Sequence, residues 1–75
     1  MNEEEIKARD DVARQIRELK KKKAFTIDSL ADKADISSVQ LCDIYRENGD
    51  KFPSFKSMIR IFNALGLKEI TIRWG

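Results

Sequence analysis

The stretch TIDSLADKADISSVQLCDIYRENG, from Thr26 to Gly49, decides the fold expected of this chain. Thr26 can cap a short helix, because apolar residues follow it at helical spacing. These residues are Ile27, Leu30, Ala31 and Ala34. Asp35 then interrupts the pattern with a residue that tolerates the left-handed backbone of a tight turn. Ser37 can cap a second helix over 38 to about 47, which the following Asn-Gly pair ends. The stretch therefore predicts two short helices joined by a tight turn.

The flanking sequence predicts further helices and one strand. On the N-terminal side, Asn2 can cap a long helix over 3–22. Its apolar positions recur at helical spacing at Ile6, Val12, Ala13, Ile16 and Leu19. On the C-terminal side, Ser54 can cap another helix, and Gly66 suits its left-handed end. The expected buried stripe of that helix is Phe55, Met58, Ile59, Phe62 and Leu65. The alternation in KEITIRW then predicts a β-strand over 69–74.

Composition places these elements in one domain, residues 1–75, which we expect to be mainly α with four to five helices and a C-terminal β-strand. The chain is 41% hydrophobic and 37% charged, which is typical of a globular protein. Cys42 is the only cysteine and there is no histidine, so protein-ligated zinc or haem and imidazole-based catalysis are not expected. We therefore expect no cofactor, no metal and no enzymatic activity. The charged N-terminus and short apolar runs favour a cytoplasmic protein with no membrane partner.

The charge is unevenly distributed along the chain. The net charge is only +2, but the four lysines at 20–23 carry +4 and residues 51–75 carry a further +4. Residues 24–50 carry −4, because six acids oppose one lysine and one arginine. The two-helix stretch is therefore acidic, and any phosphate-binding surface must draw its cations from the flanking sequence.

The second helix of the stretch has an apolar face and a polar face. At 100° per residue, Leu41, Ile44 and Tyr45 fall on one side, which we expect to face the core. Val39 and Asp43 fall on the opposite side. In a helix-turn-helix protein, such an outer face enters the major groove of DNA. The pattern is thus compatible with DNA recognition.

The order of these motifs resembles the Cro/phage-repressor helix-turn-helix family, also called the xenobiotic-response-element family. The resemblance rests on the polar cap, Leu30-Ala31, Ile36-Ser37, and a Pro-Ser start to a helix that ends in Ala-Leu-Gly. It places the helix-turn-helix at 26–48. The tail PSFKSMIRIFNALGLKEITI resembles the antitoxin branch of the family, in which the last helix runs into a strand.

The resemblance also implies which residues contact DNA. Base edges are assigned to Ser38, Val39, Gln40 and Asp43. Val39 would contact a thymine methyl, Gln40 would pair with adenine, and Asp43 would accept from a cytosine amino group. Phosphate contacts are assigned to Thr26, Ser37, Arg46, Lys51, Ser54 and Lys56. A plain capping role for Thr26 and Ser37, and an Asp43–Arg46 pair or a solvated Asp43, remain open alternatives.

The predicted strand suggests how two copies would associate. We find no second strand in the sequence to pair with it, so its apolar face would be exposed. Antiparallel pairing with a second copy would bury Ile70, Ile72 and Trp74, with Ile61 a further candidate for this homodimer interface.

The expected function is that of a sequence-specific transcriptional repressor. Its partners would be a double-stranded DNA operator and, by resemblance, a small toxin protein encoded in a toxin–antitoxin operon. A phage regulator is the close variant. The alternative is a protein-interaction module of the same fold with little DNA affinity, which the −4 charge of residues 24–50 favours.

Overall fold

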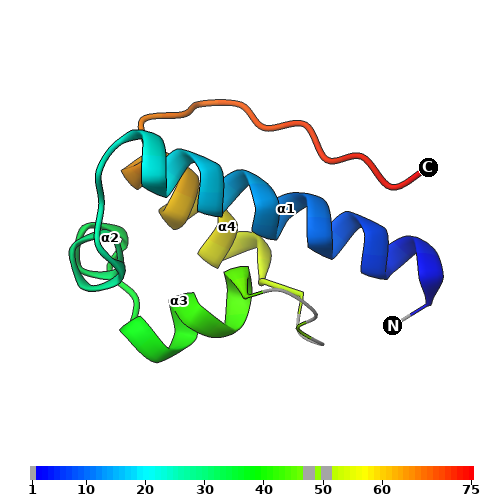
Figure 1. The fold of residues 1–75 in the computed structure, drawn as a ribbon, viewed down its shortest axis with the longest axis horizontal. Helices are drawn as coiled ribbons and strands as arrows, with labels where there is room; N and C mark the ends of the chain where they lie inside the picture. The colour runs from blue at the N-terminus through cyan, green and yellow to red at the C-terminus, as the bar shows by residue number, and fades with distance from the viewer. Residues whose placement is uncertain (1, 47–48, 50–51) are drawn as a thin grey trace.

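The fold is described from a computed structural model that places residues 2–46, 49 and 52–75. Four helices make up this part of the chain (Figure 1): α1 (Glu3–Lys22), α2 (Ile27–Ala34), α3 (Ser38–Tyr45) and α4 (Phe55–Ala64). The mainly α class agrees with the sequence prediction. Within the same ranges, no helix is both long enough and apolar enough to cross a membrane.

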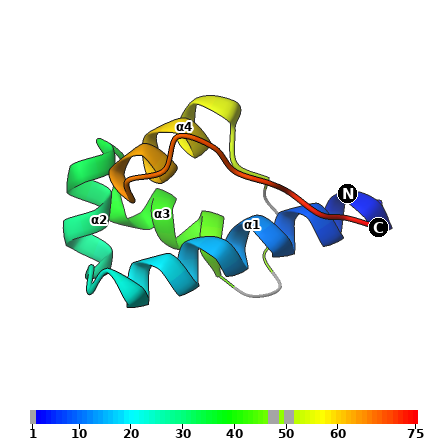
Figure 2. The same cartoon turned by 90° about the horizontal axis from the view of Figure 1, so that it is seen from above.

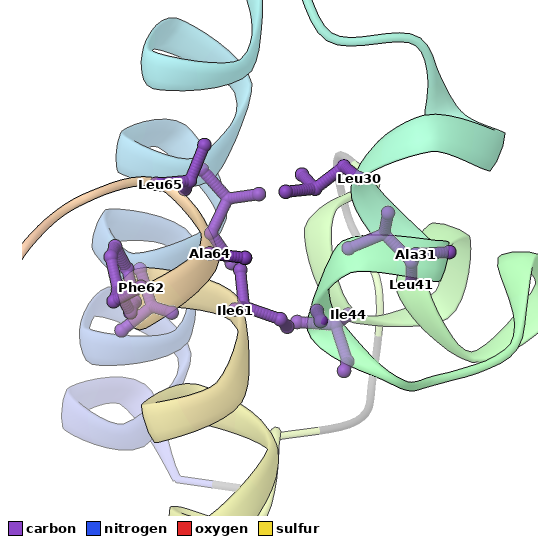
Figure 3. Close-up of a cluster of buried hydrophobic side chains, with 11 residues drawn as sticks. Leu30, Ala31, Leu41, Ile44, Ile61, Phe62, Ala64 and Leu65 are labelled. Atoms are coloured by element: carbon purple, nitrogen blue, oxygen red, sulfur yellow. The ribbon is translucent and has the colours of Figure 1, made fainter.

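The helices enclose one apolar core. α1 packs against α3, while α2 packs against both α3 and α4 (Figure 2). In Figure 3, Ile61 of α4 points toward Ile44 of α3, and Leu65 lies opposite Leu30 of α2. The buried cluster consists of Val12, Ile16, Leu30, Ala31, Ala34, Leu41, Ile44, Ile61, Phe62, Ala64 and Leu65. The two short helices are therefore held by side chains from both longer ones.

The predicted helix starts are confirmed by their caps. The side chains of Asn2, Thr26, Ser37 and Ser54 each accept a hydrogen bond from the backbone N–H three residues later. Ser29 completes a capping box in α2, because its hydroxyl oxygen accepts from the backbone N–H of Thr26 at 2.9 Å. These bonds satisfy backbone donors that have no partner inside the helix.

Left-handed residues end two of the helices as predicted. Asp35 has φ 58° and ψ 46° directly after α2. Gly66 has φ 84°, and the N–H of Leu67 donates to the carbonyl of Phe62 at 2.9 Å, which is the Schellman pattern. Ala24, between α1 and α2, also has φ 58°, which the sequence did not predict.

The prediction of a C-terminal β-strand over 69–74 is wrong. Among the described residues there is no strand, and the segment after α4 lies along α1 (Figures 1 and 2). Two side chains of α1 take its backbone groups: Gln15 Nε2 donates to the Thr71 carbonyl at 2.7 Å, and Asp11 Oδ2 accepts from the Arg73 N–H at 3.1 Å. Contacts with α1 therefore replace a partner strand.

The reason for expecting the strand dimer is lost as well. Ile70 and Ile72 are half-buried against the core of their own chain instead of forming an exposed stripe. Trp74 is 53% exposed and is not part of that core. Ile61 is fully buried by the neighbouring helices, so it is not available to an interface between copies.

The predicted buried stripe of α4 is also partly wrong. Phe55 is 75% exposed and Ile59 is 54% exposed, whereas Ile61 takes a place in the core. The buried face follows 58, 61, 62 and 65, a helical spacing as regular as the predicted one. Apolar residues occupy most of the circumference of α4, so the choice of face depends on the contacts with α2 and α3.

The third helix is shorter than predicted within the described residues. α3 ends at Tyr45, and Arg46 has an extended backbone with φ −66° and ψ 151°. The predicted end of the helix at about residue 47 lies outside the described residues.

Candidate nucleic-acid interface

The connection between α2 and α3 is a three-residue turn, 35–37. The left-handed Asp35 reverses the chain, and the N–H of Ile36 donates to the Ala31 carbonyl at 3.0 Å. The guanidinium of Arg60 on α4 donates to the Asp35 carbonyl at 3.3 Å. The turn is thus hydrogen-bonded to α2 on one side and to α4 on the other, which sets the direction in which α3 leaves it.

α3 turns three of its four predicted base-reading residues to one surface. Leu41 and Ile44 are buried, so Val39, Gln40 and Asp43 occupy the outer face of the helix. Val39 is 72% exposed. The three line a shallow cleft of about 340 Å³ between α3 and the start of α4, together with Ser37, Ile44, Phe52, Pro53, Ser54 and Ser57. The structure therefore brings these three predicted residues together.

Ser38 does not line this cleft. Its hydroxyl donates to Asp28 Oδ1 at 2.6 Å, so the side chain is directed back toward α2. A charge-assisted hydrogen bond of this kind is stronger than a neutral one. Ser38 thus links the first turns of α2 and α3, and its hydroxyl hydrogen is engaged within the protein.

The side chain of Gln40 is hydrogen-bonded to α4. Its Nε2 donates to the hydroxyl oxygen of Ser57 at 3.2 Å. Ser57 is buried, and its oxygen also accepts from the hydroxyl of Ser54 at 3.0 Å. The side chain on the outer face of α3 is therefore connected, through Ser57, to the cap of α4.

The predicted phosphate-contacting hydroxyls all serve as caps. The hydroxyl oxygen of Thr26 accepts from the N–H of Ser29, that of Ser37 from Gln40, and that of Ser54 from Ser57. A phosphate at these helix starts would therefore meet mainly backbone N–H groups and the positive ends of the helix dipoles.

The predicted cations are only partly described. Lys56 and Arg46 are both exposed, one in the first turn of α4 and the other just after α3. Lys51 lies outside the described residues. Lys56 follows Ser54 by two residues along the chain, and it is not one of the residues that line the cleft.

Two arginines that the sequence analysis did not select hold the C-terminal end of α3. Arg9 of α1 is fully buried and donates to the carbonyls of Asp43 at 3.1 Å and Ile44 at 3.0 Å, and also to the carbonyl of Arg46. Arg17 donates to the carbonyl of Tyr45 at 2.7 Å. Helix C-termini leave such carbonyls without internal partners, and a cation suits the negative end of the dipole.

The spacing of these arginines in the sequence indicates that they lie in line with the buried face of α1. Arg9 and Arg17 lie four residues either side of Ala13, which is buried. Residues at i, i+4 and i+8 share one helix face, so both arginines extend the apolar stripe of α1. An arginine in line with a buried stripe has to find carbonyl or carboxylate partners in the folded chain.

Gly49 is packed directly against this cluster. A Cβ built at position 49 would lie 2.1 Å from Nη2 of Arg9 and 2.7 Å from its Cζ. A side chain at this position would therefore have to displace the guanidinium of Arg9.

Tyr45 sits at the junction of the core and the arginines. Its ring is half-buried, and burial raises the pKa of the phenol above its usual value. The group is therefore neutral around pH 7, and the last turn of α3 gains no negative charge from it.

The geometry of the cleft offers one amide, one carboxylate and one apolar side chain on a single helix face. Comparison with protein-family models, with curated proteins and with solved structures finds no match to this chain.

Proposed function

We propose that this chain is a sequence-specific double-stranded DNA-binding protein that uses α2 and α3 as a helix-turn-helix. The observation that carries the proposal is the outer face of α3. Val39, Gln40 and Asp43 share one open cleft, while Leu41 and Ile44 of the same helix are buried. A helix with one buried face and one open face, following a three-residue turn, is suited to the major groove.

The side chains in the cleft match the groups of the major groove. An amide can pair with adenine, a carboxylate can accept from the cytosine amino group, and an apolar side chain can contact the thymine methyl. Gln40 supplies the amide, Asp43 the carboxylate and Val39 the apolar side chain. Ser38 has no direct base contact in this proposal, because its hydroxyl donates to Asp28.

Asp43 also repels phosphate, so the flanking cations must offset it. Lys56 is exposed in the first turn of α4, and Arg46 is exposed directly after α3. The backbone N–H groups at the starts of α2, α3 and α4 add donors for phosphate oxygens.

The biological role that fits this activity is transcriptional repression in the cytoplasm. The regulator of a toxin–antitoxin operon, with a small toxin protein as second partner, follows from the family resemblance, and a phage regulator is the close variant. Two copies would be needed to read two half-sites about 34 Å apart. Such a dimer would use a surface other than a paired C-terminal strand.

The test is a fluorescence-anisotropy titration of labelled random-sequence duplex DNA at several salt concentrations. Each phosphate contact contributes about −0.9 to the slope of log K against log salt. Lys56→Ala should therefore make that slope less steep by roughly one unit. Lys7→Ala removes the same charge from an exposed position near the start of α1 and should leave the slope unchanged. Equal slopes for the two variants would show that DNA does not contact the start of α4.

A protein-interaction module is the second candidate, and exposed apolar side chains favour it. Val39 and Phe52 are exposed at the cleft, within or next to an acidic stretch of sequence. Exposed apolar groups rimmed by charge often mark protein partners. Absence of DNA binding even at low salt would select this second candidate.

A further inference from the structure

The extended segment 69–75 is hydrogen-bonded to α1 along one edge (Figures 1 and 2). The carbonyl of Thr71 accepts from Gln15, and the N–H of Arg73 donates to Asp11. The two α1 residues are separated by a helical rise of about 6 Å, which matches the rise of about 6.6 Å over two extended residues. In an extended chain, the N–H and C=O groups of successive residues point to opposite sides. The backbone groups of the residues that alternate with Thr71 and Arg73 therefore point away from α1.

These alternate residues, Ile70 and Ile72, leave the second edge of the segment open. Among the described residues, no group of the protein forms a hydrogen bond with the N–H or C=O of either one. Their side chains pack against the core, which fixes the rotation of the segment about its own axis. A row of unpaired donors and acceptors on an extended chain is a template for pairing with another strand.

An apolar groove of about 410 Å³ lies between this segment and α4. Its described lining comes from α4 and from residues 67–70, with none from α1, so the groove is on the side away from the bonds to α1. Phe55 is 75% exposed and Ile59 is 54% exposed at this groove. An extended peptide uses these two features together, because main-chain bonds provide affinity and pockets for alternate side chains provide specificity.

The charge around the groove is mainly positive. Residues 54–75, which include α4 and the segment, contain four bases and one acid: Lys56, Arg60, Lys68, Arg73 and Glu69. Lys68 lines the groove, and its ammonium donates to the side-chain oxygen of Asn63 on α4 at 3.1 Å. The same face of a second copy would bring the same positive excess, whereas a partner with acidic residues would be attracted.

We propose that this groove binds an extended segment of another protein, in which apolar residues alternate with polar ones and acids outnumber bases. The bound segment adds to the open edge at Ile70 and Ile72 as a β-strand, and its alternate side chains enter the groove. Among the described residues, the groove shares none with the cleft on α3. The inference therefore does not depend on the DNA-binding function proposed above.

The probe is a phage-displayed library of random octapeptides, selected against the full chain. The enriched peptide is synthesised with a fluorescent label, and its affinity is measured by anisotropy. Ile59→Gln should weaken binding roughly three- to tenfold, because about half of this side chain is open to the peptide. Ile6→Gln is the matched control, since Ile6 is 44% exposed on α1 and does not line the groove. Failure to enrich a peptide of the alternating, acidic pattern, or equal affinities of the two variants, would overturn the inference.

Two N-methylated versions of the enriched peptide test the main-chain bonds. One carries methyl groups on the backbone nitrogens of its even-numbered residues, and the other on those of its odd-numbered residues. Only one of the two sets can face the segment, so the two peptides should differ in affinity, by roughly two- to tenfold for each main-chain bond lost. Equal affinities of the two methylated peptides would overturn strand addition.

Hydrogen exchange measured by NMR locates the bonds on this chain. A saturating amount of the enriched peptide should slow exchange of the Ile70 and Ile72 amides more than that of the Thr71 amide. Unchanged exchange at Ile70 and Ile72 would overturn the inference. So would sedimentation that finds a dimer for the wild type and a monomer for Ile59→Gln, because the groove would then belong to a second copy.

Discussion

Replacing Arg9 by methionine should strongly destabilise the fold, because this buried side chain holds the end of α3. Methionine keeps most of the apolar volume of the arginine stem and removes the guanidinium. The three carbonyls that accept from Arg9, those of Asp43, Ile44 and Arg46, then lose a charged donor.

The expected cost follows from the burial of these carbonyls. The bond to Ile44 is buried, and an unsatisfied buried acceptor costs about 1–3 kcal/mol. The bonds to the carbonyls of Asp43 and Arg46 are part-buried, so water can partly replace the lost donor. The loss of each of these bonds costs about 0.5–1 kcal/mol. The sum is about 2–5 kcal/mol. A 75-residue domain has about 4–11 kcal/mol in total, so the loss is a large part of its stability.

The assay is urea unfolding followed by circular dichroism, with Arg14→Met as the control. Arg14 is on the same helix but its side chain is half exposed, and it pairs with Asp11 and Glu18. Exposed pairs contribute about 0–1 kcal/mol. Arg9→Lys should lie between the two, because it keeps the charge and loses the planar fork. If the free energies of unfolding of Arg9→Met and Arg14→Met differ by less than about 1 kcal/mol, the hydrogen bonds from Arg9 to the end of α3 are not a major source of stability.

Three further predictions concern the turn, the core and the C-terminal segment. Ala24→Gly should stabilise the fold by about 0.5–1 kcal/mol in urea unfolding, because φ 58° strains an alanine and not a glycine; a loss of stability would contradict this. Ile61→Ala should lower the free energy of unfolding by about 2–5 kcal/mol, and Ile59→Ala should lower it by less than about 1 kcal/mol. The reverse order would mean that Ile59, as predicted from the sequence, belongs to the buried face of α4. Burial alone would raise the pKa of Asp11, but hydrogen bonds from Arg14, the Arg73 N–H and Gln15 more than offset it, so the pKa lies below its usual value of 3.8. The stabilisation from ionised Asp11 is therefore present above that value and is lost as the pH falls through the lowered pKa. Hydrogen exchange of the Arg73 amide should accelerate relative to its intrinsic rate over that acidic range, and Asp11→Asn should remove the step.

The sequence predicted those features that depend on a few neighbouring residues. The caps at Thr26, Ser37 and Ser54 each need only the N–H three residues ahead. The left-handed backbone at Asp35 and Gly66 follows from the small steric cost of that conformation for these residue types. The same local logic placed Val39 and Asp43 on the side of α3 opposite Leu41 and Ile44, whereas the assignment of Gln40 came from the family resemblance.

Features that depend on distant contacts were not predictable in this way. The face of α4 was ambiguous because Phe55, Ile59 and Ile61 are all apolar, and only contacts with α2 and α3 select among them. The alternation of apolar and polar residues near the C-terminus indicated a strand. Nothing in the local sequence reveals that the side chains of Gln15 and Asp11 would form hydrogen bonds with the backbone of this segment. Propensity for strand is readily overridden by such tertiary contacts.

The attachment of the C-terminal segment to α1 has a mechanical consequence. The start of α1 and the C-terminal end of the chain lie at the same end of the molecule, away from α2 (Figures 1 and 2). A force applied between them reaches the bonds at Arg73 and Thr71 one after the other, starting from the free end. Hydrogen bonds that are loaded one at a time break at a lower force than a row of bonds that is loaded together. An optical-tweezers pull should therefore peel this segment from α1 as a small early extension, before the four helices unfold in one larger step.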